Sequence, residues 1–120
     1  MGDCGVCIHA DYETADMFEV KEVKCRKDRY CCECGKVIPA KTPHEQIDML
    51  FDGKWWHYHT CDICAEIAGA FMCDGRVPRS LWEGMYDVMD ALTTSCFDRL
   101  KTPQAKAELQ RRWQEWKFES

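Results

Sequence analysis

The chain has 120 residues and a formal net charge of −5 at pH 7. This length suits one domain, or a small domain with an appendage, and the acidic balance argues against a general nucleic-acid-binding protein. No segment approaches the roughly 18 apolar residues of a membrane span, and no apolar signal-peptide run follows Met1. We therefore expect a cytoplasmic protein in a reducing compartment, where its ten cysteines stay as thiols and bind metal.

The first feature along the chain is the Cys-x-x-Cys pair of Cys4 and Cys7. Dithiol oxidoreductases carry such a pair after a strand and at a helix start, a context that residues 3–19 do not offer. We therefore favour metal ligation over redox chemistry for this pair. His9 is an alternative ligand nearby, although a lone histidine is more often exposed or structural.

A basic stretch follows at residues 20–30. Such a stretch can contact phosphates or an acidic partner, but we favour a solvated strand that leads into the next cysteines. Cys25 has no partner at ligand spacing, so we interpret it as a core thiol. The five basic side chains of the stretch are Lys21, Lys24, Arg26, Lys27 and Arg29.

Two further Cys-x-x-Cys pairs, Cys31/Cys34 and Cys61/Cys64, carry the strongest signal. Four thiolates that arrive as two pairs are typical of a tetrahedral structural zinc site. Gly35 allows a tight turn after the first pair, which points backbone amides at the sulfurs. We predict a zinc ion at these four cysteines.

Between the two pairs the pattern predicts a β-hairpin. Residues 47–51 alternate apolar and polar side chains, Asp52-Gly53 is a tight-turn signal, and residues 55–58 return. Residues 65–71 then have the spacing of a short helix. A cysteine knuckle, a hairpin, and a second knuckle at a helix start together predict an α+β, treble-clef-like zinc finger over residues 1–78.

Cys32 suggests a second zinc site. Neighbouring side chains of an extended chain point to opposite sides, so Cys32 and Cys31 are not expected to bind the same ion. Cys32 and three other cysteines would form a tentative second site. In one alternative Cys25, Cys96 or His9 supplies one of its ligands. In another alternative these thiols only pack. The proposed set is Cys4, Cys7, Cys32 and Cys73, so that the cofactor is one zinc ion or two.

The returning strand of the hairpin carries two histidines, His57 and His59. They share one face with Trp55, while Trp56, Tyr58 and Thr60 share the other. Aromatic residues on both faces predict that the strand is covered on both. We favour packing or hydrogen bonding beside the cluster over ligation or catalysis for the two histidines.

Residues 79–120 are expected to be a helical segment packed on the zinc module or used for partner contact. Ser80 to Glu83 has the form of a capping box for a helix that reaches about residue 100, and Thr102 and Pro103 start a second helix. Packing of its apolar stripe is our first interpretation. The alternative is an exposed aromatic anchor for another protein or a second copy, formed by Trp113, Trp116 and Phe118.

Residues 26–40, 51–55 and 58–65 resemble a group of small, cysteine-rich phage and prophage proteins, with the pattern CCECG, a WDG-like hairpin and TCxxC. The resemblance covers roughly residues 4 to 90 and departs at Lys41, where the relatives usually have glycine. It implies zinc binding and a phage accessory gene in an infected or lysogenic bacterium. Small acidic phage proteins often bind a host protein, and inhibition of CRISPR-type immunity is one instance.

We predict a non-enzymatic, zinc-stabilised protein that binds a basic or nucleic-acid-handling host protein, with a homodimer as an additional arrangement. Both proposed zinc sites are closed four-thiolate sets with no place for a catalytic water. The first alternative is a nucleic-acid-binding zinc finger that uses residues 21–29. A His-metal nuclease is less favoured, because the helix after the hairpin offers only Glu66 to complement His57 or His59.

Overall fold

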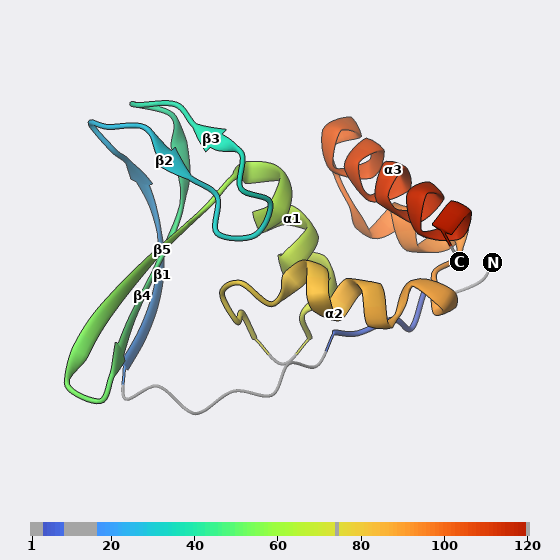
Figure 1. The fold of residues 1–120 in the computed structure, drawn as a ribbon, viewed down its shortest axis with the longest axis horizontal. Coiled ribbons are helices and arrows are strands. Elements are labelled where there is room, and N and C mark those ends of the chain that lie inside the picture. The colour runs from blue at the N-terminus through green and yellow to red at the C-terminus, as the bar shows by residue number, and fades with distance from the viewer. Residues whose placement is uncertain (1–3, 9–16, 74, 120) are drawn as a thin grey trace.

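The computed structural model describes residues 4–8, 17–73 and 75–119, which form an α+β fold. A three-stranded antiparallel sheet has the order β1-β4-β5, made of β1 (Met17–Lys24), β4 (Pro43–Phe51) and β5 (Lys54–Thr60). Two short strands, β2 (Arg29–Tyr30) and β3 (Val37–Ile38), pair with each other. The long sheet extends to one side of the molecule, and the helices gather on the other (Figure 1).

The predicted hairpin is present as β4 and β5. Phe51 pairs with Lys54, so Asp52 and Gly53 form a two-residue turn, and both have a positive φ angle, of 54° and 76°. Turns of this kind match the right-handed twist of the strands that they join. The basic stretch begins in β1, an exposed strand that lies along β4.

The far half of the hairpin is not covered on both faces. Trp55, Trp56 and His57 are exposed, whereas Thr60 at the other end of β5 is buried. The helix α1 (Asp62–Phe71) follows β5 directly and lies at that buried end (Figure 1). The prediction of a two-sided cover is therefore wrong for this half of the hairpin, because the strands extend past the helices.

Two helices begin where the sequence predicts them. α1 starts directly after Cys61. α3 (Pro103–Glu119) is capped by Thr102, whose hydroxyl oxygen accepts a hydrogen bond from the Ala105 amide over 3.2 Å. Phe71 on α1 and Leu109 on α3 are fully buried in one shared core. No helix in the described part of the chain is both long enough and apolar enough to cross a membrane.

The segment predicted as one helix to about residue 100 is instead three short ones. They are α2 (Leu81–Asp87) and the 3-10 helices η1 (Met89–Ala91) and η2 (Thr94–Arg99). Leu92 and Thr93 are extended, and Thr93 forms a capping box with Cys96 that starts η2. The single-helix prediction is wrong because the threonine side chain bonds to the local backbone and begins a new helix there.

The start of α2 is capped from a distant part of the chain. Ser80 makes no side-chain cap bond, so the predicted capping box is not formed. Instead the Glu33 carboxylate accepts hydrogen bonds from the amides of Arg79 and Leu81, over 3.0 and 3.1 Å. Glu33 lies in the first cysteine turn, and it therefore ties that turn to the helical segment.

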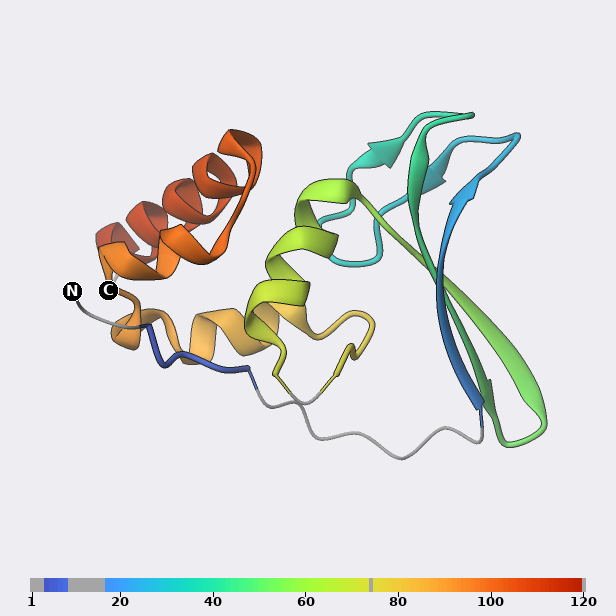
Figure 2. The same ribbon diagram turned by 180° about the vertical axis from the view of Figure 1, so that it is seen from behind.

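Residues 4–8 run beside α2, as the view from behind shows (Figure 2). The Ile8 amide donates to the carbonyl oxygen of Phe71 over 2.8 Å. The Ile8 side chain lies against Gly84 on α2, where an added Cβ would collide with it. Glycine at position 84 therefore admits the N-terminal segment to the core.

Lys41 has a φ angle of 66°. This left-handed conformation costs a residue with a Cβ about 1 to 2 kcal/mol, and glycine adopts it freely. The Lys41 amide donates to the carbonyl oxygen of Cys25 over 2.7 Å, so the turn holds its shape with lysine present.

Candidate metal centre

The structure brings the four cysteines Cys31, Cys34, Cys61 and Cys64 together, with all four sulfurs within 4.8 Å of one another. The Sγ atoms of Cys34 and Cys61 are 3.8 Å apart. Zinc–sulfur bonds of about 2.3 Å at the tetrahedral angle require about 3.8 Å between two sulfurs. The donor set and its spacing therefore fit a tetrahedral zinc ion.

Local backbone geometry positions both pairs. In the first turn the Gly35 amide donates to the carbonyl oxygen of Cys31 over 2.9 Å, and the φ angle of Gly35 is 78°. The amides of Glu33 and Cys61 each donate to Cys31 Sγ over 3.4 Å. Cys61 is the N-cap of α1 and Cys64 lies in its first turn, where the positive end of the helix dipole favours thiolates.

The thiols of the cluster perturb one another's pKa values. Hydrogen bonds from the Cys61 and Cys64 thiols lower the pKa of Cys31 far below its ordinary value. Hydrogen bonds to Cys31 raise the pKa of both Cys61 and Cys64. Like charges this close cannot all form without compensation, so the cluster would supply four thiolates only with a bound cation.

The second zinc site expected from Cys4, Cys7, Cys32 and Cys73 is not assembled. Cys4 forms a disulfide bond with Cys96, and Cys7 forms one with Cys73. A sulfur in a disulfide is not the thiolate that zinc binds. The expectation that all ten cysteines stay as thiols is therefore wrong for the four cysteines of the two disulfides.

Cys32 takes part in neither disulfide and is a free thiol. Its Sγ atom contacts Thr60 Oγ1 at 3.5 Å, and burial raises the pKa of its thiol to about 11. The argument that Cys31 and Cys32 point to different surroundings holds. The contacts of Cys32 do not place it with other metal ligands among the described residues.

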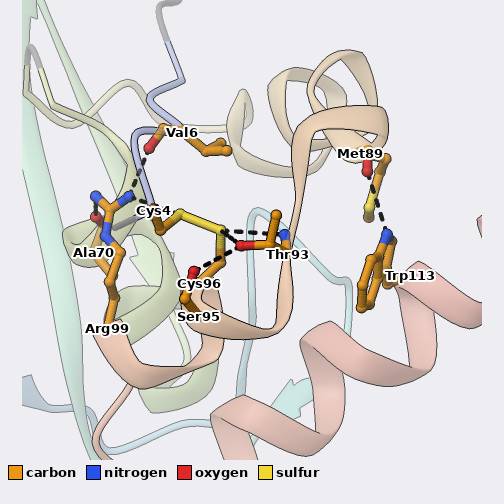
Figure 3. Close-up of a disulfide and its surroundings, with 9 residues drawn as sticks. All are labelled: Cys4, Val6, Ala70, Met89, Thr93, Ser95, Cys96, Arg99 and Trp113. Carbon is orange, nitrogen blue, oxygen red and sulfur yellow. Dashed lines mark hydrogen bonds between the residues drawn. A yellow bond between two sulfur atoms is a disulfide. The ribbon is translucent and has the colours of Figure 1, made fainter. Parts of the chain in front are cut away.

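The disulfide between Cys4 and Cys96 fastens the N-terminal segment to η2 (Figure 3). Next to it, the Arg99 guanidinium donates to the carbonyl oxygens of Val6, over 2.7 Å, and Ala70. The guanidinium also lies over the Phe71 ring, 4.5 Å from its centroid. These contacts make residues 4–8 part of the packed core.

A group of three metal-ligating side chains escaped the sequence analysis. Cys25 Sγ, a nitrogen of His44 and a nitrogen of His59 lie within 4.8 Å of one another. The sequence favours a core thiol at Cys25 and a packing or hydrogen-bonding histidine at His59, and it does not single out His44. No fixed spacing in the sequence signals the group, because its three members come from a loop, from β4 and from β5.

His57, the other histidine of the hairpin, belongs to a polar row on the sheet. Its Nδ1 atom lies 2.5 Å from Asp48 Oδ1, and Lys21 Nζ lies 2.9 Å from Asp48 Oδ2. Burial alone would raise the pKa of Asp48, but hydrogen bonds from His57, Gln46 and Lys21 lower it below its ordinary range. One of the five basic residues of the 20–30 stretch is therefore engaged within the sheet.

The C-terminal aromatic residues divide into two kinds. Trp113 is half-buried, and its ring lies tilted against Phe97 with the ring centroids 5.6 Å apart. Its Nε1 atom donates to the Met89 carbonyl oxygen over 3.2 Å (Figure 3). Trp116 is also half-buried against the core. Phe118 is 94% exposed. The two tryptophans therefore pack against the core. Of the three residues of the predicted anchor, only Phe118 is exposed.

No protein-family model matches the chain, and neither a curated protein nor a solved structure matches it. The fold and the four-cysteine group define the class of the protein. The chain is a small α+β protein with a three-stranded sheet, helices, and a four-cysteine group able to hold a metal ion.

Proposed function

We propose that this chain is a non-enzymatic, zinc-stabilised protein of the treble-clef type that binds another protein. The order of cysteine turn, hairpin, and second cysteine pair at the start of α1 supports the treble-clef assignment. The four-cysteine group leaves no position for a water molecule, which favours structural zinc over catalytic zinc.

The observation that carries the binding role is a set of exposed apolar side chains at the far end of the sheet, which we call the sheet tip. They are 42% to 57% exposed. Clusters of large apolar side chains on a surface mark interaction sites, and tryptophan is enriched among the residues that dominate binding. The sheet tip consists of Met17, Phe18, Val20, Trp55 and Trp56.

Strand register places apolar side chains on both faces of the sheet tip. Phe18 and Trp56 flank Met49 on one face, and Met17 and Trp55 flank Leu50 on the other. Among the residues that the structure describes, both faces of the sheet tip carry exposed side chains, so a partner can contact either face. A protein groove that encloses the twisted hairpin fits this shape.

The partner that we propose is a host protein with a basic binding surface. The net charge of −5 favours association with a basic protein, through faster encounter and charge complementarity. The resemblance to phage proteins supports a bacterial host, and a nucleic-acid-handling defence effector of the CRISPR type is one such partner.

The contacts of two residues disfavour the alternative functions. Glu66, the only residue that the helix offered to a nuclease site, accepts hydrogen bonds from the Lys101 amide and from Thr102. Lys21 of the basic stretch is paired with Asp48. A nucleic-acid-binding role predicts an affinity that falls steeply with salt, which distinguishes it from the proposal.

Co-purification from bacterial host cells with quantitative mass spectrometry tests the proposal. We expect one host protein to be enriched with the wild type and lost with Trp55→Ser/Trp56→Ser. Phe118→Ser, which removes an exposed aromatic side chain at the other end of the chain, is the matched control and keeps the enrichment. The purified partner should then bind wild type but not the double variant in calorimetry. Equal enrichment in all three proteins, or none in any, refutes the proposal.

A further inference from the structure

We propose that Cys25, His44 and His59 form a second metal site, with three protein ligands and a fourth position open to water or an exogenous ligand. The site is separate from the four-cysteine group and does not rest on the proposed binding function. Its ligands come from the loop after β1, from β4 and from β5.

The distances between the three donor atoms suit one ion. His44 Nε2 lies 2.9 Å from His59 Nδ1, and Cys25 Sγ lies 3.8 Å from the former and 4.0 Å from the latter. At the tetrahedral angle, zinc bonds of about 2.0 Å to nitrogen and 2.3 Å to sulfur require about 3.3 Å between the nitrogens and about 3.5 Å between nitrogen and sulfur. Small movements of the two rings bring every distance to these values.

One ligand is already oriented for metal. His44 is 2% exposed, and its Nδ1 atom lies 2.9 Å from the carbonyl oxygen of Thr42. A carbonyl oxygen only accepts, so Nδ1 carries the proton and Nε2 presents its lone pair to Cys25 and His59. This backbone contact is the outer-shell support that metal-ligating histidines usually have.

A histidine pair without metal explains only part of this arrangement. One hydrogen bond accounts for the 2.9 Å separation of His44 and His59. The Cys25 thiol lies within 4.0 Å of both ring nitrogens but has one proton, so it can donate a weak hydrogen bond to only one of them at a time. A thiolate between two imidazoles selects zinc or cobalt over magnesium and calcium, which prefer oxygen ligands.

The fourth position distinguishes this site from the four-cysteine group. Among the residues that the structure describes, no fourth cysteine, histidine, aspartate or glutamate belongs to the group. Cys25 and His59 are half-buried rather than enclosed, so small molecules can reach their side of the site. Three protein ligands with an open position are typical of zinc sites that exchange water or bind an external ligand.

Titration of the full chain with Co²⁺ tests the proposal, because thiolate-to-cobalt charge-transfer and visible bands report each occupied site. We expect two equivalents in the wild type and one in His59→Gln and Cys25→Ser. His57→Gln, the same substitution on the same strand outside the group, should keep two. One equivalent in the wild type overturns the proposal, as does a second equivalent that survives both His59→Gln and Cys25→Ser.

The remaining equivalent also reports folding. A variant that keeps the tetrathiolate cobalt spectrum has kept the fold, so its loss of the other ion is local. If His59→Gln loses both ions, the milder Cys25→Ser decides the question. Azide should shift the visible bands of the second equivalent in the wild type and leave the spectrum of His59→Gln unchanged. A wild-type spectrum that azide does not alter contradicts the open fourth position.

Discussion

Glu66 joins α1 to the start of α3, and replacing it with glutamine tests how strongly the two helices are coupled. Its carboxylate accepts hydrogen bonds from the Lys101 amide over 2.6 Å, the Thr102 amide over 3.0 Å and the Thr102 hydroxyl over 2.8 Å. Burial alone would raise the pKa of Glu66, but these hydrogen bonds lower it. The carboxylate is therefore held in its charged form at neutral pH.

Glu66→Gln keeps one carbonyl acceptor and removes the charge and the second carboxylate oxygen. A hydrogen bond to a charged group contributes about 1.5 to 3 kcal/mol, and a charge at a helix N-terminus about 0.3 to 1 kcal/mol. Thr102 still caps Ala105, and one acceptor survives. We therefore expect the free energy of unfolding to fall by about 1 to 2 kcal/mol, roughly one hydrogen bond to a charged group.

Urea unfolding of the metal-loaded protein at pH 7, followed by circular dichroism, measures this change. Glu115→Gln is the matched control, because it makes the same substitution at an exposed position of α3, where Glu115 pairs with Arg111 at 2.8 Å. Exposed pairs of this spacing contribute only about 0.3 to 0.5 kcal/mol. If Glu66→Gln and Glu115→Gln unfold at the same urea concentration, the coupling of α1 and α3 through Glu66 is refuted.

Four further outcomes are expected. Gly84→Ala should lose about 1 to 3 kcal/mol by overpacking against Ile8, whereas Gly69→Ala on α1, where an added Cβ meets nothing, should not destabilise in thermal unfolding. Lys41→Gly should gain about 1 kcal/mol in the same assay by relieving a positive φ angle, and a loss would contradict the left-handed turn. Stripping metal with a chelator should abolish the near-ultraviolet tryptophan signal, because zinc binding of about 10 to 16 kcal/mol rivals the entire stability of a domain, about 5 to 15 kcal/mol; an unchanged signal would argue against a structural ion. Cys73→Ser should cost up to about 4 kcal/mol, since its disulfide spans a sequence separation of 66, and wild-type stability in that variant would count against the cross-link.

Short-range patterns predicted the parts of the fold that depend on neighbouring residues. The spacing within each Cys-x-x-Cys pair, the Asp52-Gly53 turn and the Thr102 cap all act over a few residues, and each is found where the sequence indicates it. Two short-range predictions fail, the Ser80 capping box and the single helix to about residue 100. In the second case the local bonds of Thr93 outweigh the apolar stripe that favours one continuous helix.

Contacts between distant residues could not be read from spacing. Cys4 and Cys96 are separated by 92 positions. The residues around Cys4 do not indicate whether it forms a disulfide with Cys96 or binds metal. Glu33 replaces Ser80 as the cap of α2 because the first cysteine turn happens to fold against that helix. Each of these choices depends on which surfaces the core brings together.

The sequence by itself determined the four-cysteine group, the hairpin and the starts of α1 and α3, because each follows from the chemistry of a short segment. The tertiary structure decided which cysteines cross-link, which tryptophans are covered, and that Cys25, His44 and His59 meet. The reason is physical: β1, β4 and β5 align by backbone hydrogen bonds that do not depend on side-chain identity. Side chains far apart in the chain become neighbours only once that alignment exists.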